Sequence, residues 1–100
     1  MNVLIGKARV SVCANGRDEA NRTRYTYAIT LPTGTYYNDD LRSGGDGTER
    51  EGMNSLLTFL TACAESYPDG DDADMFPRNV AEWAAENAEE IYSQSVEFQN

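Results

Sequence analysis

The clearest structural signal in the sequence is the stretch Arg24-Tyr25-Thr26-Tyr27-Ala28-Ile29-Thr30-Leu31. Its side chains alternate in character along the chain, and alternation with a period of two is typical of a β-strand that has one buried face. The opposite face carries Arg24 and smaller residues. The residues that share the apolar face are Tyr25, Tyr27, Ile29 and Leu31. The stretch therefore predicts a strand with one face in the core.

The residues on either side of this strand predict an antiparallel meander of three strands. Residues 2–13 interleave β-branched residues with polar ones, which is typical of one strand, and Asn15-Gly16 is a turn signal. Leu31-Pro32-Thr33-Gly34 predicts a tight turn, because proline presets one dihedral angle and glycine accepts a positive φ. Residues 35–38 then return as a short third strand. The glycine-rich residues 39–47 are predicted to form a loop.

The second half of the chain predicts two helices. Thr48 and Glu51 match a capping-box pattern at the start of the first helix, and Pro68 ends it. The apolar residues of this helix repeat at helical spacing and are Met53, Leu56, Leu57, Leu60, Ala64 and Tyr67. Phe76-Pro77 opens the second helix, in which one side carries Val80, Trp83, Ala84, Asn87 and Ile91. The tail, residues 96–98, has three open alternatives: it extends the helix, frays, or pairs as an edge strand.

These elements predict an α+β fold in which a three-stranded antiparallel meander packs on one face against two C-terminal α-helices. A chain of 100 residues is large enough for one modest core, so residues 1–100 are expected to form a single domain. Cys13 and Cys63 both fall at apolar positions and are expected to be buried free thiols in a reducing compartment, with a single disulfide between them as the alternative. No segment has the length of a membrane span or a signal peptide, so we expect a cytoplasmic protein.

Charge is distributed unevenly between the two halves of the chain. The net charge is −9, and from Glu51 onward the chain carries eleven acidic residues and a single basic one, Arg78. Glu82, Glu86 and Glu90 are spaced four residues apart, so that like charges repel one another along a helix. The acids on the second helix and on the loop that leads into it are Glu82, Glu86, Glu89, Glu90, Asp69, Asp71, Asp72 and Asp74.

This acidic surface has two interpretations that remain open. A solvated charged face would serve solubility alone. Alternatively, carboxylates one helical turn apart, about 6 Å along the axis, approximate the spacing of phosphates along one nucleic-acid strand. The helix would then fit a basic groove built for nucleic acid, and the eight carboxylates would be the partner-binding site. Such binding weakens as the salt concentration rises.

Catalytic and metal chemistry have less support in the sequence. Counted from Asp69, the ligand positions of an EF-hand loop fall on residues such as Ala73 and Val80, which cannot bind calcium. No metal and no cofactor are therefore predicted. The chain has no histidine, and its glycine-rich segment before Thr48 lacks the lysine of a phosphate-binding loop. We expect no enzymatic activity.

Two further features of the sequence are candidate binding sites. Arg17, Arg22 and Arg24 lie near Tyr25 and Tyr27, a combination that can bind single-stranded nucleic acid by stacking. The tyrosines share the apolar face, however, and the net charge is negative, so core packing is favoured and no direct nucleic-acid binding is expected. Trp83 is expected to be a core residue, with a binding hot spot at the edge of the acidic face as its alternative role.

One segment also carries a resemblance. Phe76-Pro77-x-x-Val80-x-Glu82-Trp83-Ala84-x-x-Asn87-x-x-Glu90-Ile91 resembles a segment of small uncharacterised proteins of phages and mobile elements. The whole chain resembles anti-CRISPR and anti-restriction proteins in being short and acidic. This resemblance implies a non-enzymatic inhibitor, active in the host bacterial cell, that binds the basic nucleic-acid-binding surface of a defence complex.

A second class of function remains open beside the inhibitor. The chain would then be an interaction or assembly module of a phage or mobile element. An apolar or tyrosine-rich sheet surface would bind the partner, and the acids would serve solubility. No membrane partner is expected, and the sequence does not predict an oligomeric state.

Overall fold

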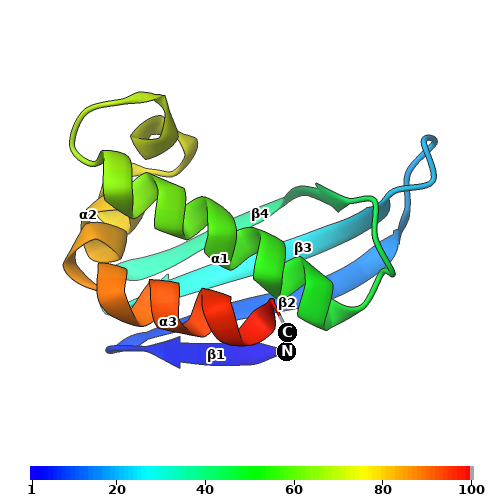
Figure 1. Ribbon diagram of the computed structural model, residues 1–100, viewed down its shortest axis with the longest axis horizontal. Helices are drawn as coiled ribbons and strands as arrows, with labels where there is room; N and C mark the ends of the chain where they lie inside the picture. Colours follow the sequence, from blue (N-terminus) through cyan, green and yellow to red (C-terminus); the bar gives the residue numbers. More distant parts are fainter. Residues whose placement is uncertain (100) are drawn as a thin grey trace.

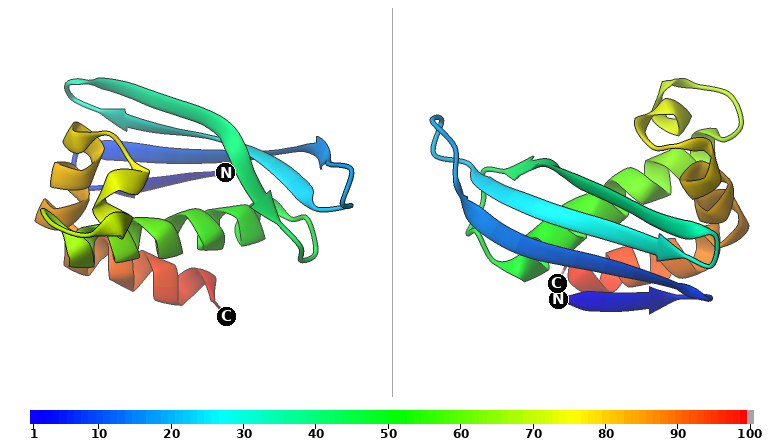
Figure 2. Two further views of the ribbon diagram at one scale, coloured as in Figure 1. Left: turned by 90° about the horizontal axis from the view of Figure 1, so that it is seen from above. Right: turned by 180° about the vertical axis from the view of Figure 1, so that it is seen from behind.

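The computed structural model describes residues 1–99, which form a four-stranded antiparallel sheet, three α-helices and a short 3-10 helix. The strands form a meander in chain order: β1 (Asn2–Ile5), β2 (Ala8–Arg17), β3 (Thr23–Leu31) and β4 (Gly34–Ser43). The helices that follow are α1 (Glu49–Ser66), η1 (Asp71–Met75), α2 (Arg78–Glu86) and α3 (Ala88–Phe98). All of the helices lie on one side of the sheet (Figure 1, Figure 2), which confirms the predicted α+β class and the one-sided packing.

The sheet has four strands because residues 2–13 form a hairpin, not the single strand that was predicted. Gly6 has a φ of 59°, a left-handed conformation that glycine adopts without strain. Gly6 and Lys7 form a two-residue turn between the paired residues Ile5 and Ala8. Buried positions are odd-numbered before this turn and even-numbered after it. That change of parity was the signal in the sequence for a turn.

The last strand is also longer than the predicted residues 35–38. Tyr27 pairs with Asn38 and Tyr25 pairs with Leu41, so β4 contains one more residue than β3 over this interval. A β-bulge of this kind lets a strand continue past residues that do not fit its alternation. Leu41 thereby returns to the core, although the polar run before it resembles a loop.

The predicted apolar face of β3 is confirmed, since Tyr25, Tyr27, Ile29 and Leu31 are all buried. Tyr25 also connects the sheet to α1, because its hydroxyl donates a hydrogen bond to the carbonyl oxygen of Thr48 at 2.8 Å. Above the tyrosine ring, α1 presents Gly52. A Cβ atom on Gly52 would lie 2.5 Å from Cδ1 of Tyr25 and 2.9 Å from Cγ1 of Val12. Only glycine permits this approach of helix and sheet.

The start of α1 follows half of the predicted capping box. The Thr48 side chain accepts a hydrogen bond from the backbone N–H of Glu51 at 3.2 Å, as predicted. The Glu51 carboxylate does not reach back to Thr48. Instead it accepts hydrogen bonds from the backbone N–H groups of Asp46 and Gly47 and from the hydroxyl of Ser43. The loop before α1 is thus folded around the Glu51 carboxylate.

The second predicted helix is divided at Asn87 into α2 and α3. Asn87 has φ −119° and ψ 27°, outside the helical range, and its side-chain N–H donates to the carbonyl oxygen of Trp83 at 2.9 Å. Asparagine favours such breaks because its side chain competes with the backbone for hydrogen bonds. The tail continues as α3, the first of the three alternatives. Arg50 contacts the C-terminal end of α3, where the Arg50 guanidinium lies 5.0 Å from the centre of the Phe98 ring.

The two cysteines differ in environment. Cys63 is buried, as predicted, and burial raises the pKa of its thiol. The prediction of burial is wrong for Cys13, which follows the buried Val12 in β2 and therefore points to the opposite, uncovered face of the sheet. Within residues 1–99, no helix has the length and apolar character needed to cross a membrane.

We expect Gly52→Ala to destabilise the protein even though alanine is the better helix former. Overpacking costs about 1–3 kcal/mol, and contact with a ring held inside the sheet places the cost at the upper end. The gain in helix propensity is at most about 1 kcal/mol. Urea unfolding should show a lower free energy of unfolding. Thr58→Ala on the exposed side of α1 is the control, and an equally stable Gly52→Ala protein would contradict the packing.

Thiol labelling should separate the two cysteines. At neutral pH, a water-soluble thiol reagent is expected to label one thiol per native chain and two per chain in denaturant, because only Cys13 is accessible. Mass spectrometry of the labelled protein gives the count. Cys13→Ser should reduce native labelling to zero. Native labelling of Cys63 at a rate similar to that of Cys13 would contradict its burial.

Candidate functional site

The eight carboxylates predicted to bind a partner are carried by segments at one end of the molecule. η1, α2 and the first turn of α3 lie together at one end of the 34 Å long axis, and the tip of the β2–β3 hairpin lies at the other (Figure 1). These acidic residues, which lie close together in the sequence, are therefore also gathered in space. We call this surface the acidic end; its residues are Asp69, Asp71, Asp72, Asp74, Glu82, Glu86, Glu89 and Glu90.

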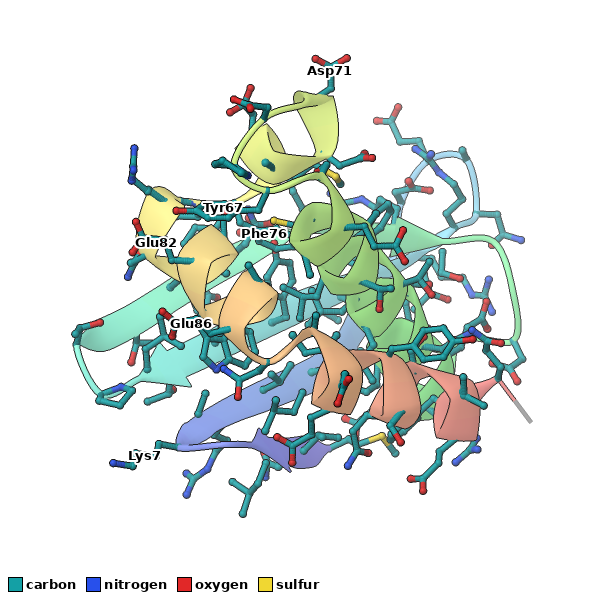
Figure 3. All side chains as sticks on the ribbon, turned by 60° about the vertical axis from the view of Figure 1, so that its left-hand side comes forward. Lys7, Tyr67, Asp71, Phe76, Glu82 and Glu86 are labelled. Atoms are coloured by element: carbon teal, nitrogen blue, oxygen red, sulfur yellow. The ribbon has the colours of Figure 1, made fainter. Side chains whose placement is uncertain are left out.

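The four aspartates belong to a folded segment that is held against α1. Ala73 and Phe76 are buried, and the Cys63 thiol lies 3.9 Å from the carbonyl oxygen of Ala73. The aspartates themselves are exposed, and Figure 3 shows Asp71 at the outer tip of η1. The predicted linker is thus a short helix that positions its carboxylates in solvent.

The glutamates do not form the regular row that one continuous helix would give. Glu82 and Glu86 lie on α2, whereas Glu89 and Glu90 lie on α3, beyond the break at Asn87. Only the first pair keeps the spacing of one helical turn. The hypothesis of a phosphate-like row depended on an uninterrupted helix, and the break removes that basis. The acidic end is a cluster spread over three elements.

Two of the four glutamates already have protein partners. Glu90 accepts a hydrogen bond from the backbone N–H of Gly6 at 2.8 Å, which joins α3 to the β1–β2 turn. Glu82 accepts from Nε of Arg78 at 3.0 Å. Desolvation, together with the Glu82 carboxylate, raises the pKa of the Tyr67 phenol. By contrast, Glu86 and Glu89 are exposed, and their carboxylates make no hydrogen bond or ion pair with other residues among 1–99.

A cleft of about 440 Å³ opens at the acidic end between α2 and the β1–β2 and β3–β4 turns. Trp83, Leu31 and Pro32 contribute apolar surface to it. The polar and charged residues of its lining include Glu82, Glu86, Asn79, Asn87 and Lys7. Figure 3 shows Glu82 and Glu86 on α2, with Lys7 on the β1–β2 turn. Sequence reasoning selected both glutamates but missed the cleft, because its walls come from segments far apart in the chain.

Trp83 is 9% exposed and belongs to the core, as predicted. It also lines the cleft, so it stands at the boundary between the core and the acidic end. Its indole N–H is buried and has no hydrogen-bond acceptor in the described part of the chain. The alternative role considered from the sequence, a hot spot at the edge of the acidic face, is compatible with this position.

The uncovered face of the sheet is a second candidate surface. Leu4 is 66% exposed and Tyr37 is 64% exposed, and both point away from the helices. Tyr25 and Tyr27 are buried on the opposite face and cannot stack on a nucleic acid there. Among residues 1–99, no group of three or more His, Cys, Asp or Glu side chains is arranged to hold a metal ion.

Comparison with protein-family models, curated protein sequences and solved structures finds no match for the chain. A function is therefore inferred from the chain's own residues and their placement.

The Glu90 contact predicts unequal effects for two adjacent glutamates. Glu90→Ala should speed hydrogen exchange at the Gly6 amide by about tenfold, because that amide loses a charged acceptor. The urea midpoint should also fall. Glu89→Ala changes the same net charge but removes no contact, so both quantities should stay at the wild-type values. NMR-detected exchange gives the first measurement. Equal effects of the two substitutions would contradict a structural role for Glu90.

Proposed function

We propose that this chain is a non-enzymatic inhibitor that docks its acidic end onto the basic nucleic-acid-binding surface of a host defence complex. A CRISPR effector and a restriction enzyme are the two classes of target. The observation that carries the proposal is the gathering of eight carboxylates on segments at one end of the molecule. Arg78 is the single basic residue in η1, α2 and α3.

Repulsion among the carboxylates of the acidic end favours binding to a cationic partner. Like charges this close destabilise the isolated chain, and a basic surface removes that cost on binding. Opposite charges also steer the encounter, so association is fast at low salt and slows as salt is added. Seven of the eight carboxylates sit on helices, which are anchored by buried residues such as Ala73 and Val80. Little conformational freedom is therefore lost on docking.

The arrangement of the carboxylates favours an inhibitor that blocks the partner's basic groove over one that closely imitates nucleic acid. Only Glu82 and Glu86 keep a helical-turn spacing, and the remaining acids lie on η1, before it, and on α3. Such a cluster matches a basic surface in sign of charge but does not repeat the phosphate spacing. The inhibitor would compete with nucleic acid by occupying the same basic groove.

Phage plating tests this proposal. The protein is expressed in bacteria with and without a CRISPR or restriction system, and the plating of a targeted phage is counted. Wild-type protein should raise plating at least about tenfold on the defended host and leave the undefended host unchanged. The double variant Asp71→Lys/Asp72→Lys should lose this effect, because each reversal opposes docking. Glu19→Lys/Asp39→Lys, an equal charge change outside the acidic end, should retain it.

Two outcomes would contradict the proposal. One is unchanged plating on every host of a panel that covers CRISPR and restriction systems. The other is equal rescue by wild-type protein and the Asp71→Lys/Asp72→Lys variant. Circular dichroism of both double variants serves as the folding control.

The exposure of Leu4 and Tyr37 favours a second candidate function, an interaction or assembly module that binds through the uncovered sheet face. Under this alternative, Leu4→Ser/Tyr37→Ser should abolish capture of the partner from a host lysate. Asp71→Lys/Asp72→Lys should leave capture intact, and moderate salt should not weaken it. The opposite pattern would exclude this candidate in favour of the acidic end.

A further inference from the structure

We infer that the cleft at the acidic end is a receptor for the guanidinium group of one arginine side chain of the partner. The inference rests on the proposed function, since it names the chemical group that a basic surface would insert. It goes further in assigning that group to a defined place, between α2 and the two sheet turns.

The walls of the cleft suit the two parts of an arginine side chain. Pro32 and Leu31 offer apolar surface to the methylene groups. Trp83 adds the exposed part of its indole, and an aromatic ring attracts a guanidinium. A volume of about 440 Å³ is more than one side chain fills, so a short length of the partner's backbone enters as well.

Glu86 is the main anchor for the charge. Its carboxylate lines the cleft and makes no hydrogen bond or ion pair with other residues of the described chain. Glu82 lines the cleft too, but one of its oxygens is held by Arg78 at 3.0 Å. A planar guanidinium can donate two parallel hydrogen bonds to a free carboxylate. Glu86 can accept such a pair without giving up an existing contact.

Two other lining residues refine the choice of ligand. Lys7 also lines the cleft, so its ammonium opposes a cationic ligand in part, and Glu86 supplies the lining carboxylate that has no ion pair in the described chain. The Trp83 indole N–H lacks an acceptor. A guanidinium carries only donors, whereas the backbone carbonyl groups of an arginine residue are acceptors. An arginine within a peptide therefore complements the cleft better than a free guanidinium ion does.

Trp83 makes the inference directly measurable, because it is the only tryptophan in the sequence. Its fluorescence is followed while the protein is titrated with N-acetyl-argininamide. Saturable binding is expected with a dissociation constant on the order of millimolar, which is typical of a ligand this small. N-acetyl-lysinamide should bind more weakly, and the neutral isostere N-acetyl-citrullinamide should not bind at the same concentrations. NMR shifts of the Asn79 and Asn87 side-chain amides give a second readout.

Two substitutions that remove charges of opposite sign from the cleft provide a sharper test. Glu86→Gln should weaken binding of N-acetyl-argininamide by about tenfold, because a charged acceptor is lost. Lys7→Gln should tighten it by about twofold, because a like charge is removed from the rim. Glu89→Gln, exposed and outside the cleft lining, should change nothing. A merely structural effect of the substitutions would not change sign between Glu86 and Lys7.

Several results would overturn the inference. They are equal binding of the arginine and citrulline probes, equal binding of the arginine and lysine probes, an unaffected Glu86→Gln variant, or no response in either readout. If the cleft fails in this way while Asp71→Lys/Asp72→Lys still abolishes phage rescue, the proposed function stands without the cleft. If arginine binds as expected but the protein never affects plating, the inhibitor proposal fails and the receptor remains.

Discussion

The close approach of α1 to β3 at Gly52 determines where the rest of the structure can lie. Without a side chain at this position, the helix rests directly on the ring of Tyr25, whose hydroxyl also holds the carbonyl oxygen of Thr48. Tyr25 therefore fixes both the distance of α1 from the sheet and the position at which the helix starts. Because η1, α2 and α3 all pack against α1, their positions follow from this contact. The position of the acidic end therefore follows from the packing of its helices on α1.

The acidic end combines helices anchored in the core with carboxylates that differ in their contacts. The Glu90 carboxylate accepts a hydrogen bond from the Gly6 amide, and Glu82 forms an ion pair with Arg78. Glu86 and the aspartates are exposed to solvent. A bulk count of charge treats all of these as equal. The structure divides them into acids that hold the end together and acids that can meet a partner. Substitutions chosen from the sequence alone, such as reversal of Glu90, would mix the two effects.

Sequence reasoning succeeded where one local pattern decides the structure. The alternation around Tyr25 gave the buried face of β3, and Thr48 gave the start of α1. It failed where two distant segments meet. Asn87 looked like one more residue on a helical face, and its pattern did not show that it lies against the Gly6 turn, where a Cβ atom on Gly6 would come within 2.9 Å of its Oδ1, or that it divides α2 from α3. The cleft could not be predicted for the same reason, because α2 and the two sheet turns are brought together only by the fold.

The loop before α1 gathers hydrogen-bond donors around the carboxylate of Glu51. Backbone N–H groups that converge before a helix are the usual cradle for a phosphate group. Here the amides of Asp46 and Gly47 and the hydroxyl of Ser43 already surround an anion that the chain itself supplies. The Glu51 carboxylate thus takes, within the chain, the place that a bound anion takes in such a cradle. The start of α1 is therefore held by a charge from within the chain, whereas most charges of the acidic end are exposed.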